Sequence, residues 1–102
     1  MDKRFIPLSP VEELQARRAL ADELAAHPGI PIPAVIRKIR ATLRLTIVEY
    51  AKLCGVSART LQDIEREVSS PTLVTAEKLL RPMGMVTSAS PKPLPGHPRV
   101  DK

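Results

Sequence analysis

Apolar residues recur every three or four positions along most of the chain, and prolines or glycines separate the runs. Such spacing places them on one side of a helix. Five helices are predicted, over about residues 10–26, 33–43, 47–54 and 58–66 and from just after Pro71 onward. No alternation of apolar and polar residues is long enough to compete with the helical pattern, so the predicted fold class is all-α.

The expected helix ends carry residues suited to them. Three hydroxyl residues precede predicted helices and can accept a hydrogen bond from a free backbone N–H there: Ser9, Thr46 and Ser57. Glu12 completes a capping box with the first of these. Gly55 is expected to end the helix over 47–54, and Pro82 to bend or end the last one.

The chain divides into three expected parts. Residues 1–32 form an N-terminal helical extension and a Pro-rich connector, and residues 33–85 form the main helical domain. Residues 86–102 are rich in proline with little to bury, so this tail is expected to be disordered. In the extension, an apolar stripe that includes Leu14, Leu20 and Leu24 either covers the core of the domain or pairs with a second copy of the chain or with another protein.

Composition and charge indicate what kind of core the protein has and what kind of molecule it binds. Aromatic residues make up 2% of the chain, so the core must be built from aliphatic side chains. The formal net charge is +5 and the pI is about 9.9, and the basic excess lies beyond residue 32. A basic domain of this kind favours nucleic acid as the partner.

The sequence does not support an enzyme, a metal-binding protein or a membrane protein. There is no nucleophile with a base, no supported carboxylate pair and no metal-ligand spacing, so we expect no enzyme activity, no cofactor and no metal. The single cysteine, Cys54, is predicted to be a small core residue, and His27 and His97 are isolated and have no assigned role. With neither a signal peptide nor an apolar run of about 20 residues, a cytoplasmic protein is expected.

Residues 49–67 read EYAKLCGVSARTLQDIERE and meet the requirements of a helix-turn-helix, in which two helices cross at a steep angle around a short turn. A small residue is needed where the helices touch, and Ala51 supplies it. Gly55 suits the positive φ of the turn. Val56 fills the angle between the helices, while Leu61 and Ile64 anchor the second helix from beneath.

Residues 33–85 resemble the Cro/CI-type helix-turn-helix domains, also called lambda repressor-like or XRE-like. The matching elements are Arg40, Thr46, Gly55-Val56-Ser57, Ile64-Glu65-Arg66, Pro71-Thr72-Leu73 and Met83-Gly84. The resemblance implies a lambda repressor-like bundle, a homodimer and binding of double-stranded operator DNA by the second helix of the motif.

Three features depart from the family pattern. Ile47 replaces a glutamine that braces the recognition helix or touches phosphate. Glu67 replaces a glycine, so the recognition helix is expected to run on or to end less sharply. Pro82 and the Pro-rich tail stand where the family has a last helix.

The resemblance also assigns DNA-binding roles position by position. Residues 58, 59 and 62 are expected at base edges, as Ala58, Arg59 and Gln62, since arginine can bind guanine and glutamine adenine. The expected phosphate contacts are Arg44, Thr46, Lys52, Ser57 and Thr60, with Arg40 a less favoured candidate. Asp63 is expected to face away from the groove.

The leading hypothesis is a sequence-specific repressor, bound to the nucleoid when it occupies DNA. Its narrower form is a HipB- or HigA-like antitoxin that represses its own operon and binds a toxin protein. A phage or mobile-element repressor is the nearest alternative. A protein-interaction module on the same scaffold, without DNA binding, is the alternative that Ile47 and Glu67 favour.

Overall fold

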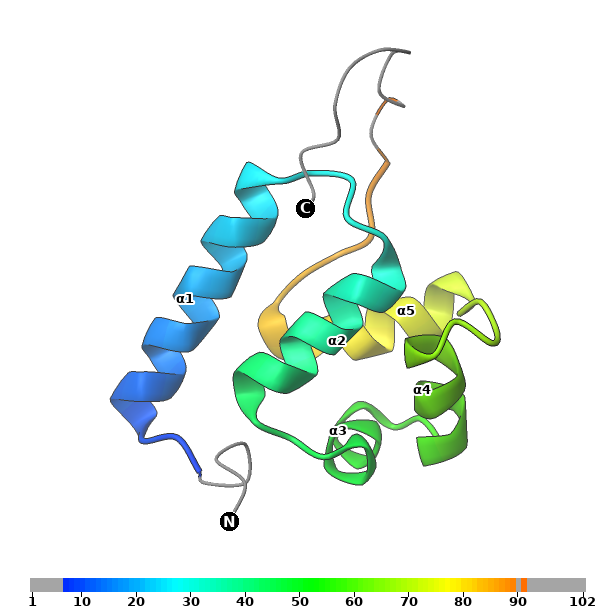
Figure 1. The fold of residues 1–102 in the computed structure, drawn as a ribbon, viewed down its shortest axis with the longest axis horizontal. Coiled ribbons are helices and arrows are strands. Elements are labelled where there is room, and N and C mark those ends of the chain that lie inside the picture. The colour runs from blue at the N-terminus through cyan, green and yellow to red at the C-terminus, as the bar shows by residue number, and fades with distance from the viewer. Residues whose placement is uncertain (1–6, 90, 92–102) are drawn as a thin grey trace.

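The computed structural model of the protein describes residues 7–89 and 91. Within them the chain forms five α-helices and a terminal 3₁₀ turn: α1 Pro10–Ala26, α2 Ile32–Leu43, α3 Ile47–Cys54, α4 Ala58–Glu65, α5 Leu73–Leu80 and η2 Arg81–Met83. α2 crosses the middle of the molecule, with α1 on one side and α3, α4 and α5 on the other (Figure 1). The predicted all-α class is confirmed.

Most predicted helix bounds hold within a residue. α1 and α3 span the predicted residues, and α2 starts at Ile32 instead of Pro33. After η2 the described residues form no further helix. The predicted disorder of the tail falls mainly on residues 90 and 92–102, which lie outside the described residues.

Four of the five helices begin with a hydroxyl cap. Each hydroxyl oxygen accepts a hydrogen bond from the backbone N–H three residues later; the caps are Ser9, Thr46, Ser57 and Thr72. Thr72 is the cap that the sequence analysis did not identify. Capping boxes form with Glu12 and Glu49, and the hydrogen bonds from Ser9 hold the pKa of Glu12 below its ordinary value.

The C-terminal ends of α2, α3, α4 and η2 share the Schellman motif, in which a left-handed residue lets two N–H groups reach back to the last turn, whereas α1 ends without it. The left-handed residues are Arg44 (φ 55°), Gly55 (φ 76°), Glu67 (φ 60°) and Gly84 (φ 66°). At the end of α4, Glu67 N–H bonds the Ile64 carbonyl at 3.0 Å and Val68 N–H bonds the Asp63 carbonyl at 2.9 Å.

This geometry corrects the expectation for Glu67. α4 ends at Glu65 and does not run on, because Glu67 adopts the left-handed conformation that a glycine would adopt more easily. The helix therefore stops as sharply as in a chain with glycine at this position, at the cost of local strain.

The core is aliphatic apart from Tyr50, Cys54 and Glu65. The Tyr50 hydroxyl donates to the Leu79 carbonyl, and burial raises the pKa of this side chain. Cys54 is buried as predicted, and burial raises the pKa of its thiol. α1 contributes Leu20, which is buried, and Leu24, which is partly buried. Leu14 at the start of the predicted stripe is exposed, so only the second half of that stripe meets the core.

Polar contacts also fix α1 to the domain. Lys38 Nζ of α2 lies 2.7 Å from Glu23 Oε2, and Arg17 donates to the Pro82 carbonyl after α5. The extension is therefore held against both α2 and η2.

We predict that Glu67→Gly stabilises the fold. Relief of left-handed strain, about 1–2 kcal/mol, exceeds the entropy cost of glycine, about 0.5–1 kcal/mol, and the loss of an exposed ion pair with Arg37 is small. Urea unfolding followed by circular dichroism should show a gain of about 0.5 kcal/mol. The control is Arg66→Gly, at an ordinary φ of −87°, which should destabilise. Equal losses from both variants would contradict the assignment of strain to residue 67.

Candidate DNA interface

The turn between α3 and α4 is short and closely defined. Gly55 has φ 76° and ψ 32°, and the Val56 N–H bonds the Ala51 carbonyl at 3.0 Å. A Cβ added at Gly55 would meet nothing within 4 Å. Glycine is therefore favoured here by the positive φ and not by lack of space, as the sequence analysis expected.

The inner faces of the two helices are buried. Ala51 of α3 is 2% exposed, and Leu61 and Ile64 of α4 are 0% and 1% exposed. Val56 is partly buried and packs against this cluster. These contacts set the angle between α3 and α4 and leave the opposite face of α4 to solvent.

The outer face of α4 carries the two side chains best suited to read bases. The Arg59 side chain is 83% exposed, and Gln62 is exposed one turn later. Asp63 Oδ2 lies 3.4 Å from Arg59 Nε, so Asp63 stands on the same side of α4 as Arg59 and does not face away from it. The ion pair engages Nε and leaves the terminal guanidinium nitrogens of Arg59 for another acceptor.

The start of α4 presents two hydroxyl groups. Ser57 Oγ accepts from the Thr60 N–H at 3.0 Å and donates to Thr60 Oγ1 at 2.8 Å. Ser57 is thus engaged in capping, whereas the Thr60 hydroxyl hydrogen can donate to an anion. Ala58 is partly buried against the core and offers less surface than Arg59 or Gln62.

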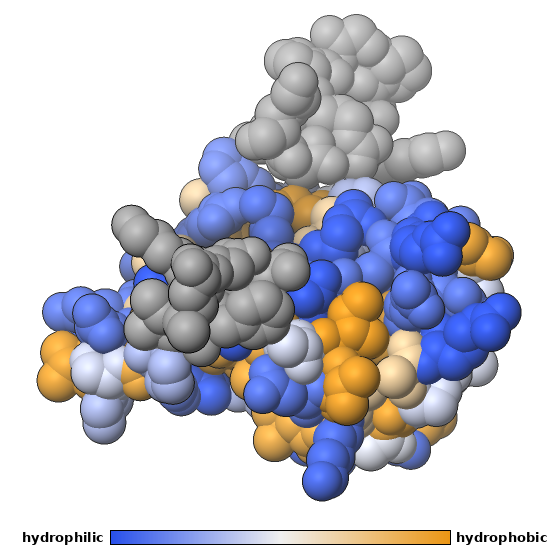
Figure 2. Space-filling view, turned by 60° about the horizontal axis from the view of Figure 1, so that its bottom comes forward, coloured by the Kyte–Doolittle hydropathy of each residue, from blue (hydrophilic) through white to orange (hydrophobic). Residues whose placement is uncertain are grey.

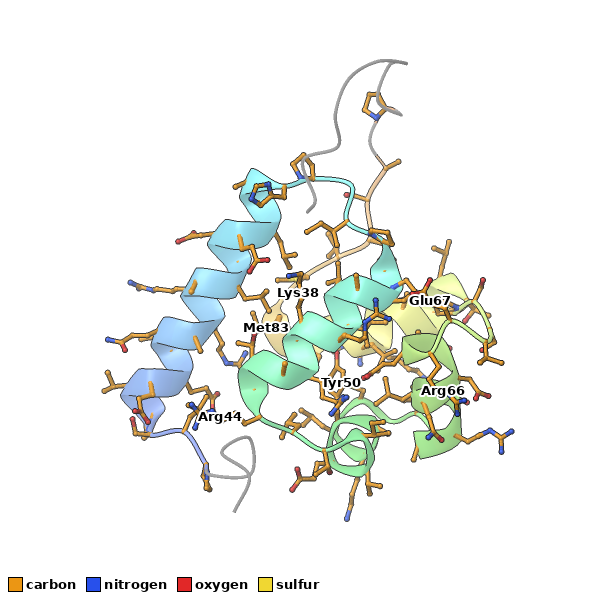
Figure 3. All side chains as sticks on the ribbon, in the orientation of Figure 1. Lys38, Arg44, Tyr50, Arg66, Glu67 and Met83 are labelled. Carbon is orange, nitrogen blue, oxygen red and sulfur yellow. The ribbon has the colours of Figure 1, made fainter. Side chains whose placement is uncertain are left out.

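The predicted phosphate contacts outside α4 separate into two groups. Lys52 is exposed on α3, and Thr46 is half-buried at the start of that helix. Arg44 lies beside the first turns of α1, across the molecule from α4 (Figure 3), and it attracts the Glu12 carboxylate. The structure does not bring Arg44 together with the side chains of α4.

Arg40 has a structural role in this fold. Its Nε and Nη2 lie 2.8 and 2.9 Å from the two carboxylate oxygens of Glu65, and its Nη1 bonds the Leu45 carbonyl at 3.2 Å. The Glu65 side chain is 6% exposed, and the ion pair raises the pKa of Arg40. Arg37 donates to the backbone carbonyl of Glu65. Two arginines of α2 therefore hold the last turn of α4.

The sequence alone did not reveal this function of Arg40 and Glu65. Both belong to the motifs that carry the family resemblance, yet separate motifs do not show that two residues 25 positions apart meet. A usable signal was available in Glu65, which directly follows the buried Ile64 and lies on the apolar side of α4.

Some apolar side chains interrupt the polar surface on the α3 side. Figure 2 shows orange side chains near the middle of the face that carries α3. The large apolar residues of α3 that are strongly exposed are Val48 at 65% and Leu53 at 60%. The exposed surface of α3 is therefore partly apolar.

A model of the helix-turn-helix family matches residues 36–89, just over half of the chain. The chain belongs to this family. Its helix-turn-helix domain is of the XRE, or Cro/CI, type, a family of DNA-binding transcription regulators. No curated protein and no solved structure matches the chain.

The part of the chain that the structure describes lacks two further features. No helix there is long and apolar enough to cross a membrane. Nor does any group of three or more His, Cys, Asp or Glu side chains there form a possible metal site.

We predict that Arg40→Met lowers the free energy of unfolding by about 3 kcal/mol, because it leaves the Glu65 carboxylate buried without a partner. Thermal and urea unfolding measure the change. The matched control is Lys38→Met on the same helix, which breaks an exposed ion pair and should cost less than about 1 kcal/mol. The double variant Arg40→Met, Glu65→Leu should recover part of the loss. Equal effects of Arg40→Met and Lys38→Met would overturn the assignment.

Proposed function

We propose that the protein is a sequence-specific transcriptional repressor that reads operator DNA with α4. The observation that carries this proposal is the division of α4: its inner face is fixed by Leu61, Ile64 and the Arg40–Glu65 ion pair, and its outer face presents Arg59 and Gln62 to solvent. Arginine binds guanine O6 and N7 in a bidentate manner, and glutamine binds adenine N6 and N7.

Phosphate contacts would position α4 in the major groove. Thr60 and Ser57 lie at the start of α4, where a recognition helix enters the groove, and Lys52 lies on the exposed side of α3. Thr46 remains a proposed phosphate contact, and Ala58 remains proposed to face a base edge. The net charge of +5 favours the approach to DNA.

A homodimer is part of the proposal. Three apolar side chains are exposed just beyond the end of α4, where the chain passes into α5: Val68 at 67%, Leu73 at 73% and Val74 at 65%. Pairing of this surface with a second copy would bury it and place two α4 helices on one side of the dimer. The operator would then hold two half-sites about 34–36 Å apart.

The antitoxin hypothesis is a narrower form of this function. It rests on the family resemblance and on α1, which lies outside the family match and exposes Val11 and Leu14. A toxin protein would dock on α1 while α4 stays on DNA in the cytoplasm. A phage or mobile-element repressor would share the DNA-binding mechanism, and the neighbouring gene distinguishes the two.

A protein-interaction module without DNA binding is the second candidate. The exposed Val48 and Leu53 favour it, as does Ile47 at a position where the family resemblance places a glutamine. The two functions differ in their response to salt, since only DNA binding releases condensed counterions.

We predict that the full chain selects particular sequences from a random duplex pool. Because DNA binding releases condensed counterions, the affinity should fall steeply between about 50 and 200 mM salt. Arg59→Ala should cost about 1–3 kcal/mol on the selected site and relax one base position, whereas Lys52→Ala should weaken all sequences alike. Electrophoretic mobility shift and selection sequencing measure both effects.

Three results of this experiment decide between the candidates. No binding at low salt would exclude the repressor and leave the protein-interaction module. Binding without selectivity would remove sequence specificity from the proposal. Equal losses from both variants on every sequence would show that α4 does not present its Arg59 face to the bases.

We predict that Leu73→Arg weakens the dimer, because the added charge cannot be buried against a second copy without a partner. Sedimentation should then shift toward the monomer, and affinity for a two-site operator should fall at least about tenfold with single half-site binding unchanged. Val11→Arg, at a similarly exposed position on α1, is the control. A loss of dimer from Val11→Arg alone would place the interface on α1 instead.

A further inference from the structure

A cavity of about 670 Å³ lies where the end of α1, the connector to α2 and the segment after η2 meet. Its volume falls in the range of small-molecule sites, about 300–1,000 Å³. None of the residues that line it belongs to α3 or α4, so it is separate from the candidate DNA interface. The DNA-reading function does not account for it.

The lining of this cavity excludes charged ligands. Its wall is mainly aliphatic, with Leu24, Ile30, Val35 and Leu80 among its residues, and it contains no Asp, Glu, Lys or Arg. Placing an ion against such a wall would remove its hydration without providing a partner. Met83 and Met85 also line the cavity, and their flexible side chains can adapt to the shape of an apolar guest.

One polar group of the wall lacks a partner. His27 lines the cavity, and its Nδ1 is buried with no hydrogen bond to the described residues. An unpaired buried nitrogen costs free energy that a hydrogen bond would recover. The χ2 torsion of histidine is broad, so a rotation of the ring can turn this nitrogen toward the cavity. A hydroxyl group can donate and accept, and therefore matches either tautomer of the ring.

We propose that this cavity is a binding site for a neutral, mainly apolar small molecule with one hydroxyl group, an alcohol or a phenol, which bonds His27. The apolar body occupies the space between α1 and the segment after η2. The ligand thereby joins the N-terminal extension to the end of the helical domain. This site is independent of the repressor function and would exist in a protein-interaction module as well.

The test is a titration of the ¹⁵N-labelled full chain with 2-naphthol, followed by NMR. Saturable shifts are expected for amides of residues 24–35 and 80–88, with those of α4 unchanged. The charged analogue 2-naphthoate should bind at least about tenfold more weakly, because the wall contains no Lys or Arg to pair with its carboxylate. No saturable shifts, or shifts centred on Val11, Leu14 and Val68, would overturn the proposal.

Matched variants test the wall and the ring separately. Ala25→Phe places a large side chain at an exposed edge of the cavity and should reduce 2-naphthol affinity at least about tenfold. Ala19→Phe, exposed on the same helix but outside the cavity, should leave it unchanged. His27→Phe keeps an aromatic ring but removes both ring nitrogens, so affinity should fall about fivefold.

Three further outcomes of these experiments would contradict the proposed binding site. Equal effects of Ala25→Phe and Ala19→Phe, or tighter 2-naphthol binding by His27→Phe, would contradict the assigned geometry. Concentration-dependent shifts of the same amides without the probe would identify a second copy of the chain as the occupant and overturn the small-molecule assignment.

Discussion

Glu65 is the buried charged residue of the described core, and a buried carboxylate is unfavourable unless its oxygens are paired. Arg40 satisfies both oxygens, while Arg37 donates to the backbone carbonyl of the same residue. The last turn of α4 is therefore tied to α2 through side chain and backbone together. Because the C-terminal end of α4 is held in this way, the helix can present Arg59, near its N-terminal end, in a fixed direction.

The ends of the helices provide the second constraint. Four Schellman motifs end helices sharply, and glycine occupies the left-handed position in two of them. Glu67 takes it at the end of α4 and lies 3.4 Å from Arg37, the arginine that also holds Glu65. A strained residue thus stands beside the ion-pair network that fixes the recognition helix, and the sharp end of α4 follows from local backbone geometry as much as from packing.

α2 connects two separate surfaces of the molecule. Its first turn contributes Ile32 and Val35 to the wall of the apolar cavity, and its later turns carry Arg37 and Arg40, which hold α4. The cavity lacks charged residues, whereas the outer face of α4 is polar. The two surfaces therefore suit chemically different partners while sharing one helix of the scaffold.

Local sequence determined where the helices are and how the motif turns. Helix starts could be predicted from Ser9, Thr46 and Ser57 because capping is a local hydrogen bond. The turn could be predicted from Gly55 because a positive φ is a local property of the backbone. The family resemblance placed Arg59 and Gln62 on the outer face of α4, and both side chains are exposed there. Tertiary structure alone decided that Arg40 pairs with Glu65 and that Arg44 lies beside α1 instead of α4. Each of these depends on the meeting of elements, and periodicity along the chain contains no information about which side chains meet across the core.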